Sequence, residues 1–244
     1  MFADILTIVQ KELQELLFQR GQGRSNSVRL LVFVGVFGIL LPLQNGIESI
    51  QSPVSLAFWA WIPYLLVSGI TADTFAGERE RHTLETLLAS RLSDRAILFG
   101  KLAAVILYGW GITITAVLMS LVSVNIAFWQ GTLTLYPPAL FAVILTVSLL
   151  IALFAAGLGI AISLRAPTAR AAQQTMSIIM FVVMIPLFAL SFLPRALIIS
   201  LDLFLDGLNL IQIAAGALLL LTALDVGLVM YALSQFKRSK LISD

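Results

Sequence analysis

The fold is decided by an uncharged apolar stretch, which runs from Ala139 to Leu164 and reads ALFAVILTVSLLIALFAAGLGIAISL. A helix needs about 20 apolar residues to cross a hydrocarbon core of about 30 Å, and this stretch is long enough. Five further stretches are predominantly apolar: Val28–Ile47, Val54–Phe75, Leu102–Val124, Met176–Leu193 and Leu210–Leu233. The sequence therefore predicts an all-α membrane protein with six transmembrane helices.

The composition favours a lipid environment for nearly the whole chain. Of the 244 residues, 59% are hydrophobic and 11% are charged, whereas soluble domains are about half apolar and about a quarter charged. Six crossings leave room only for short connections, so residues 1–244 are predicted to form a single transmembrane domain. One histidine and no cysteine exclude disulfides and multi-histidine or thiolate metal sites, so we expect no metal.

The positions of the Lys and Arg residues predict the orientation. All of them except Arg195 lie before or at the start of the first span, between the second and third, after the fourth, or after the sixth. Because basic loops stay in the cytoplasm, we expect a multi-pass protein of the cell membrane with both termini cytoplasmic. Aromatic residues gather near the other face, as in an interfacial belt: Trp59, Trp61, Tyr64, Phe128, Trp129 and Tyr136.

Local features refine this topology. Residues 2–20 place apolar side chains at three- and four-residue intervals, which predicts a helix lying in the membrane interface; an amphipathic helix packed on protein is the alternative. Three prolines lie within or at the ends of spans: Pro42, Pro63 and Pro186. They should kink their helices, with neighbouring helices bonding the freed carbonyls. Gly157 and Gly159 make one side of the fourth span small, so close helix packing is expected there.

Most of the polar sequence between spans lies in one stretch, residues 76–95. Residues 78–81 alternate in sign, and three leucines then recur at helical spacing: Leu84, Leu87 and Leu88. This pattern predicts a charged hinge followed by a short amphipathic helix along the membrane surface. Its leucines would either enter a groove on a partner or pack against the chain's own bundle, and the pattern favours neither.

The same stretch resembles a known family. The sequence FAGERER at 75–81 is followed by TLE at 83–85, LLA at 87–89, LS at 92–93 and GK at 100–101. Together with KEL at 11–13 and the six spans, this is similar to the type-2 ABC permeases, the membrane subunits of type V ABC exporters. Two positions depart from the family: glycine is usual where this chain has His82, and proline is frequent where it has Arg91.

The resemblance implies half of the translocation path of an ATP-driven exporter. Residues 76–95 would form the cytoplasmic coupling region that docks on a separate ATP-binding subunit, through Glu78, Arg79, Glu80, Arg81, Thr83, Leu84, Glu85, Leu87 and Leu88. Two such subunits would bind ATP and Mg²⁺, and a second permease copy or a paralogue would complete the path through the membrane lipid. Aromatic residues of the second and fifth spans are candidates for lining the cavity: Trp59, Trp61, Tyr64, Phe181 and Phe188.

The chain lacks signs of its own catalysis. Gly100-Lys101 is its only Gly-Lys pair, but Arg95 and Leu102 stand where a GxxxxGK[ST] phosphate loop needs glycine and Ser or Thr. The sequence therefore predicts a chain that is not an enzyme, with ATP hydrolysis in the partner subunit. The basic residues are dispersed as topology requires, so we expect no nucleic-acid partner.

Asp225 is the exception in the last span, because an ionised carboxylate at membrane depth is costly unless it is paired or hydrated. It should face protein or a cavity, either as a structural partner for Ser, Thr or Arg on a neighbouring span or as a proton or substrate site. The second role would make the chain an ion-coupled secondary transporter. A membrane anchor for a cytoplasmic complex, without transport, is the remaining alternative to the exporter.

Overall fold

The computed structural model describes residues 2–18, 23–53, 55–83, 91–190 and 210–236, and within these ranges it is helical without strands. The prediction of an all-α protein is thereby confirmed for the described residues. The helices are α1 (Phe2–Phe18), α2 (Gly23–Gly35), the π-helix η1 (Val36–Leu40), α3 (Leu41–Asn45), α4 (Glu48–Gln51), α5 (Ser55–Glu80), α7 (Asp94–Ala127), α8 (Pro138–Ser163), α9 (Ala169–Leu190) and α11 (Leu210–Gln235).

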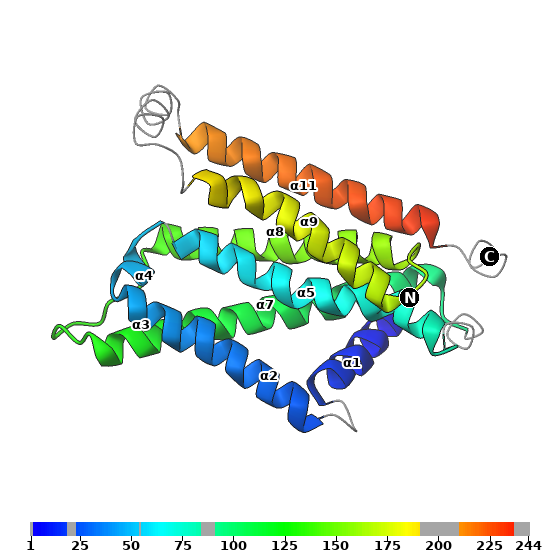
Figure 1. Cartoon of the computed structure of the whole chain (residues 1–244), viewed down its shortest axis with the longest axis horizontal. Helices are drawn as coiled ribbons and strands as arrows, with labels where there is room; N and C mark the ends of the chain where they lie inside the picture. The colour runs from blue at the N-terminus through cyan, green and yellow to red at the C-terminus, as the bar shows by residue number, and fades with distance from the viewer. Residues whose placement is uncertain (1, 19–22, 54, 84–90, 191–209, 237–244) are drawn as a thin grey trace.

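The long helices run back and forth between two ends of the bundle (Figure 1). One end carries the start of α1, the end of α5, the start of α7 and the turn between α8 and α9, and we name it the polar end. The other end carries α4 and the loop 128–137, and we name it the opposite end. Within the bundle α5 packs on α7, α8 and α9, while α11 packs on α8.

Three helices of the described chain are long and apolar enough to cross a membrane: α7, α8 and the segment Ala214–Gln235 of α11. A shorter apolar helix, Leu30–Asn45, runs from α2 through η1 to α3. The leucine-rich segment 84–90, which was predicted to contain the amphipathic coupling helix, lies outside the described residues.

Pro42 explains the change of helix type in the first predicted span. Proline has no N–H to donate to the carbonyl four residues earlier, which is that of Gly38. The Ser123 hydroxyl of α7 donates to the Gly38 carbonyl oxygen over 3.0 Å instead. The preceding turn is widened to a π-helix, in which the Leu41 N–H bonds to the Val36 carbonyl. A neighbouring helix thus satisfies the freed carbonyl at Pro42, as predicted.

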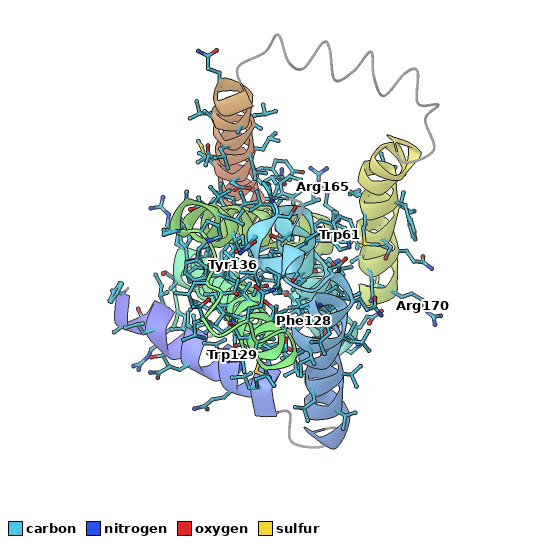
Figure 2. All side chains as sticks on the ribbon, turned by 90° about the vertical axis from the view of Figure 1, so that its left-hand side faces the viewer. Trp61, Phe128, Trp129, Tyr136, Arg165 and Arg170 are labelled. Atoms are coloured by element: carbon cyan, nitrogen blue, oxygen red, sulfur yellow. The ribbon has the colours of Figure 1, made fainter. Side chains whose placement is uncertain are left out.

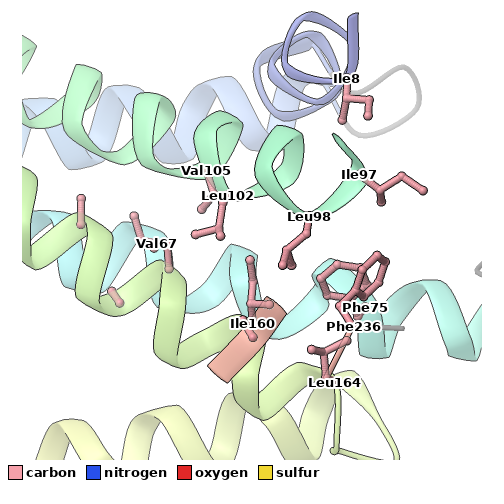
Figure 3. Packing of buried hydrophobic residues seen from close by; sticks show 14 of the residues in the cluster. Ile8, Val67, Phe75, Ile97, Leu98, Leu102, Val105, Ile160, Leu164 and Phe236 are labelled. Atoms are coloured by element: carbon pink, nitrogen blue, oxygen red, sulfur yellow. The ribbon is translucent and has the colours of Figure 1, made fainter. Parts of the chain in front are cut away.

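The two larger hydrophobic clusters among the described residues hold the helices together. The cluster at the polar end joins α1, α5, α7, α8, α9 and α11 (Figure 3), and its large members include Ile8, Phe75, Leu98, Ile160 and Phe236. The cluster at the opposite end joins α4, α5, α7 and α8, and includes Ile50, Trp59, Ile62, Val124 and Tyr136. The packing therefore fixes both ends of the bundle separately.

Glycines set the spacing of α8 from its neighbours. A Cβ atom on Gly159 would collide with the Thr71 side chain of α5, and one on Gly157 would lie 3.1 Å from Leu228 Cβ of α11. The predicted close packing along this side of α8 is confirmed.

Helix α1 lies on α7 through part of its surface. Ile8 and Val9 are buried, and Ile8 covers Gly100 so closely that a Cβ atom there would have no room. Phe2 and Leu6 remain exposed on the same helix. Contact with protein, the alternative raised from the sequence, thus accounts for one side of α1 and leaves other apolar side chains uncovered.

The aromatic residues of the loop 128–137 lie at the opposite end. Figure 2 looks onto this end and labels Phe128, Trp129 and Tyr136 together with Trp61 of α5. Trp129 is exposed and Tyr136 is buried, so only part of the predicted belt faces outward.

Candidate functional site at the polar end

A buried lysine joins three helices at the polar end. Lys101 of α7 is 3% exposed, and its Nζ atom lies 2.9 Å from Glu12 Oε1 of α1 and 2.7 Å from Glu78 Oε1 of α5. Two carboxylates facing one ammonium leave the group with a net negative charge. A buried ion pair holds its partners strongly in place, because removal of one partner leaves an uncompensated charge.

The next residue of α5, Arg79, binds the end of α8. Its Nη1 donates to the Ala166 carbonyl over 2.7 Å and its Nη2 donates to the Leu164 carbonyl over 2.9 Å. The last carbonyls of a helix have no partner within the helix, and a cation is favourable beside them. Arg79 therefore ties the end of α5 to the end of α8.

Glu80 makes the corresponding contact with α9. Its Oε1 accepts a hydrogen bond from the Ala169 N–H over 3.3 Å, at the first residue of that helix. A carboxylate is favourable at a helix N-terminus, where backbone N–H groups lack partners. Two consecutive side chains of α5 thus hold both sides of the turn that joins α8 to α9.

Ser163 connects the last turn of α8 to the backbone of α5. Its hydroxyl accepts hydrogen bonds from the Phe75 and Ala76 N–H groups over 3.0 and 2.9 Å. It donates to the Ala72 carbonyl over 3.0 Å, so its one donor and two acceptor positions are all used. Ala72 O and Ala76 N are partners in a regular α-helix. Ser163 therefore bonds to backbone groups of α5 that belong to the hydrogen-bond ladder of that helix.

Helix α5 ends in a Schellman motif. The His82 N–H bonds to the Arg79 carbonyl and the Thr83 N–H bonds to the Glu78 carbonyl, over 3.1 and 2.9 Å. His82 has a φ of 56°, the left-handed conformation that glycine adopts without steric cost. The glycine expected here from the resemblance would avoid this cost, whereas this chain has a side chain at the one residue of the motif where a side chain is strained.

We name Glu12, Glu78, Arg79, Glu80, Lys101 and Ser163 the connector network. It joins α1, α5, α7, α8 and α9 at the polar end. The sequence singled out Glu78, Arg79 and Glu80 for docking, and in the structure all three bond to other helices of the same chain. Arg81 is exposed and pairs with Asp73 over 3.2 Å, while Thr83 is exposed at the end of the motif.

The rest of the predicted coupling residues, Leu84, Glu85, Leu87 and Leu88, lie outside the described part of the chain. Sequence reasoning missed Ser163, Glu12 and Lys101 as site residues. A serine at the end of an apolar span, and a lysine at the start of one, are the signals by which Ser163 and Lys101 could have been found.

The aromatic residues predicted to line a cavity have different surroundings where the structure describes them. The Tyr64 hydroxyl donates to the Met176 carbonyl of α9 over 3.1 Å, and its ring stacks on Trp61 at 5.6 Å between centroids. Trp59 is buried in the cluster at the opposite end, whereas Phe181 is exposed on α9. The Phe188 side chain lies outside the described atoms.

Asp225 faces protein, as expected, and is 1% exposed. Neither carboxylate oxygen has a hydrogen-bond partner among the described residues. The structural partner from Ser, Thr or Arg that was expected on a neighbouring span is thus not found in the described part of the chain. No hydrogen bond among the described residues joins the Asp225 carboxylate to the connector network.

Comparison with known families is informative for most of the chain. The family model described as ABC-2 family transporter protein matches residues 39–215, well over half of the sequence. The match includes all of α3, α4, α5, α7, α8 and α9, and the start of α11. Within the connector network, only Glu12 falls outside it. No curated protein matches the chain.

Proposed function

Because the chain belongs to the ABC-2 transporter family, we propose that it forms half of the translocation path of an ATP-driven exporter and couples to a separate ATP-binding subunit. Family membership confirms the resemblance drawn from residues 75–101 and makes the chain a membrane permease component of an ABC transporter. In the proposed complex two ATP-binding subunits supply ATP and Mg²⁺, and a second permease copy or a paralogue completes the path.

The connector network is the observation that carries this proposal. The segment 84–90 follows directly on Thr83, whose N–H bonds to the Glu78 carbonyl at the end of α5. Glu78 in turn is fixed to Lys101, and its neighbours Arg79 and Glu80 are fixed to α8 and α9. A displacement of the segment by an ATP-binding subunit would therefore move several helix ends together. Helices move as rigid units in such transitions.

The proposed topology has six crossings, with α2 to α3, α5 and α9 crossing in addition to the three long apolar helices. The alternating direction of these helices in Figure 1 supports it. The polar end is proposed to face the cytoplasm of the cell, together with both termini, because basic residues concentrate in its loops. Exposed Phe2 and Leu6 of α1 would then enter the membrane interface.

Topology is tested with single cysteines in this naturally cysteine-free chain. Cysteines at Ser90 and Gln130 should be labelled by a membrane-impermeant maleimide from opposite sides of sealed vesicles. Labelling of both from one side would contradict the six-crossing arrangement.

Coupling is tested by Leu87→Ala combined with Leu88→Ala. Truncation of central anchors commonly costs more than about 1 kcal/mol of binding each, so the ATP-binding subunit should copurify less and hydrolysis should no longer drive export. The matched control is Leu133→Ala with Leu135→Ala, two exposed leucines at the opposite end, which should behave like the parent chain. An unchanged complex in the first variant would contradict the coupling assignment.

The two rival functions make different predictions for the same complex. An ion-coupled transporter would depend on Asp225 and would need no ATP-binding subunit, while an anchor would bind such a subunit without moving a solute. Membership of a transporter family with separate ATP-binding subunits favours the exporter over both.

A further inference from the structure

A cavity of about 140 Å³ opens at the opposite end of the bundle, between the α3–α4 region and α5. Its apolar walls include Phe37 of η1, Trp59 and Ile62 of α5 and the buried Pro42. An engineered cavity of about 150 Å³ lined by apolar side chains holds benzene. The space therefore suits a single aromatic ring or a short alkyl group.

Two polar atoms of residues in this wall, Ser55 Oγ and Trp59 Nε1, have no hydrogen-bond partner among the described residues. Ser55, at the start of α5, is 5% exposed. A buried hydroxyl without a partner costs free energy, so it calls for a group that only a ligand or water would supply. At the polar end, by contrast, the buried Ser163 hydroxyl uses all of its bonding positions.

The charge of the cavity is negative. Glu48 of α4 lines it and is exposed, and it forms no ion pair with any described residue. None of the lining residues is Lys or Arg, and the flanking sequences 44–53 and 125–137 contain neither. A carboxylate at the mouth of an aromatic-walled cavity attracts a cation and repels an anion.

We propose that this cavity binds an amphiphilic organic monocation. Its ring or short alkyl group lies between Phe37 and Trp59, its ammonium group pairs with the Glu48 carboxylate, and a polar atom of the ligand bonds to the Ser55 hydroxyl. A free amine suits the site better than the ammonium group of a phosphatidylethanolamine lipid, since the adjacent lipid phosphate would meet Glu48 without a basic side chain to neutralise it.

The test uses the purified full chain in nanodiscs of phosphatidylcholine, with binding of 2-phenylethylamine measured by calorimetry and 2-phenylethanol as its neutral counterpart. The amine should bind, and Glu48→Gln should weaken its binding about tenfold while leaving the alcohol unchanged. Glu15→Gln, an exposed carboxylate at the other end of the molecule, is the matched control and should have no effect. Equal amine affinity in the parent and Glu48→Gln chains would overturn the proposal.

Two further arms locate the ligand and identify its source. Ile62→Trp should fill the cavity and abolish binding of both compounds; unchanged binding of the amine to this variant overturns the proposed site. The chain should bind the amine with the same affinity in nanodiscs that contain phosphatidylethanolamine as in nanodiscs of phosphatidylcholine alone. If phosphatidylethanolamine weakens binding of the amine to the parent chain, and Glu48→Gln removes this competition, the site binds a lipid headgroup and the proposal of a free amine is overturned. Binding needs no ATP-binding subunit, so this test and the coupling test fail independently.

Discussion

The two ends of the bundle treat buried polar groups in different ways. At the polar end Lys101 meets two carboxylates, Arg79 meets two helix-terminal carbonyls, and Ser163 uses every hydrogen-bonding position. At the opposite end Ser55 has no partner among the described residues and lines a cavity. Glu78 Oε2 has no hydrogen-bond partner among the described residues, but its Oε1 is held by Lys101, so the groups of the polar end remain linked across helices. Linked polar groups make a rigid joint, whereas unpartnered groups around a space suit a binding site. The contrast supports the two proposals made above, transmission of motion at the polar end and ligand contact at the opposite end.

The largest effect is expected at the centre of the connector network. Lys101→Met leaves Glu12 and Glu78 close together without their cation, and removing one partner of a buried pair costs about 3–5 kcal/mol. The midpoint of thermal unfolding in detergent should fall sharply. Lys11→Met is the matched control, because Lys11 pairs with Glu15 on the exposed surface of α1, where such pairs contribute below about 1 kcal/mol.

Adding Glu12→Gln and Glu78→Gln to Lys101→Met should restore part of the lost stability, since the two negative charges are then gone. Equal stability of the Lys101→Met and Lys11→Met chains would show that the polar end is not held by this lysine, and the contrast between the two ends would lose its main support.

Replacement of serine by alanine should change the stability of the chain in opposite directions at the two ends. Ser163→Ala removes three hydrogen bonds between α8 and α5 and should destabilise the chain by about 1–3 kcal/mol. Ser55→Ala removes a buried hydroxyl that has no described partner and should stabilise it by about 1 kcal/mol. Unfolding midpoints of both variants measure the difference. A loss of stability in both would mean that the hydroxyl of Ser55 is bonded in the folded chain.

A pair of glycines on α7 tests the attachment of α1. Gly100→Ala places a methyl group against Ile8 and should cost about 1–3 kcal/mol by overpacking. Gly111→Ala points into open space on the same helix and should stabilise it by about 0.5–1 kcal/mol. Limited proteolysis should release α1 more readily only in the first variant. Similar proteolysis of both would contradict the close contact between α1 and α7.

The smallest expected effect concerns the end of α5. His82→Gly should stabilise the chain by about 1 kcal/mol, because the left-handed conformation of His82 costs a residue with a side chain about that much. His82→Ala keeps a Cβ atom at the same position and should change the unfolding midpoint little. A larger gain from alanine than from glycine would show that the imidazole ring, and not the backbone, is the source of strain.

Much of the fold was predictable because the signals are local. The uncharged run 139–164 is long and apolar enough to span a bilayer, and this follows from its own residues without reference to its neighbours. The missing N–H of Pro42 is an equally local signal. It correctly predicted that a neighbouring helix would donate a hydrogen bond to the freed carbonyl. The motif at residues 75–101 identified the family before any contact was known.

The connector network was beyond the reach of such reasoning. Glu78, Arg79 and Glu80 were recognised as charged residues of a hinge, but the pattern of alternating charge does not say which helices they touch. Lys101 meets Glu12 across 89 positions of sequence, and Ser163 meets Ala76 across 87. Pairings over such separations depend on how the helices pack, and no periodicity along the chain reports them.

The sequence by itself thus determined the all-helical fold of the described residues and the family, since each depends on residue type and spacing along single segments. Tertiary structure alone decided that Lys101 is neutralised by two helices at once, that Ser163 bonds inside the ladder of α5, and that Ser55 faces a cavity. The physical reason is that the free energy of a buried polar group depends on its partners, and those partners are chosen by packing between segments distant in the chain.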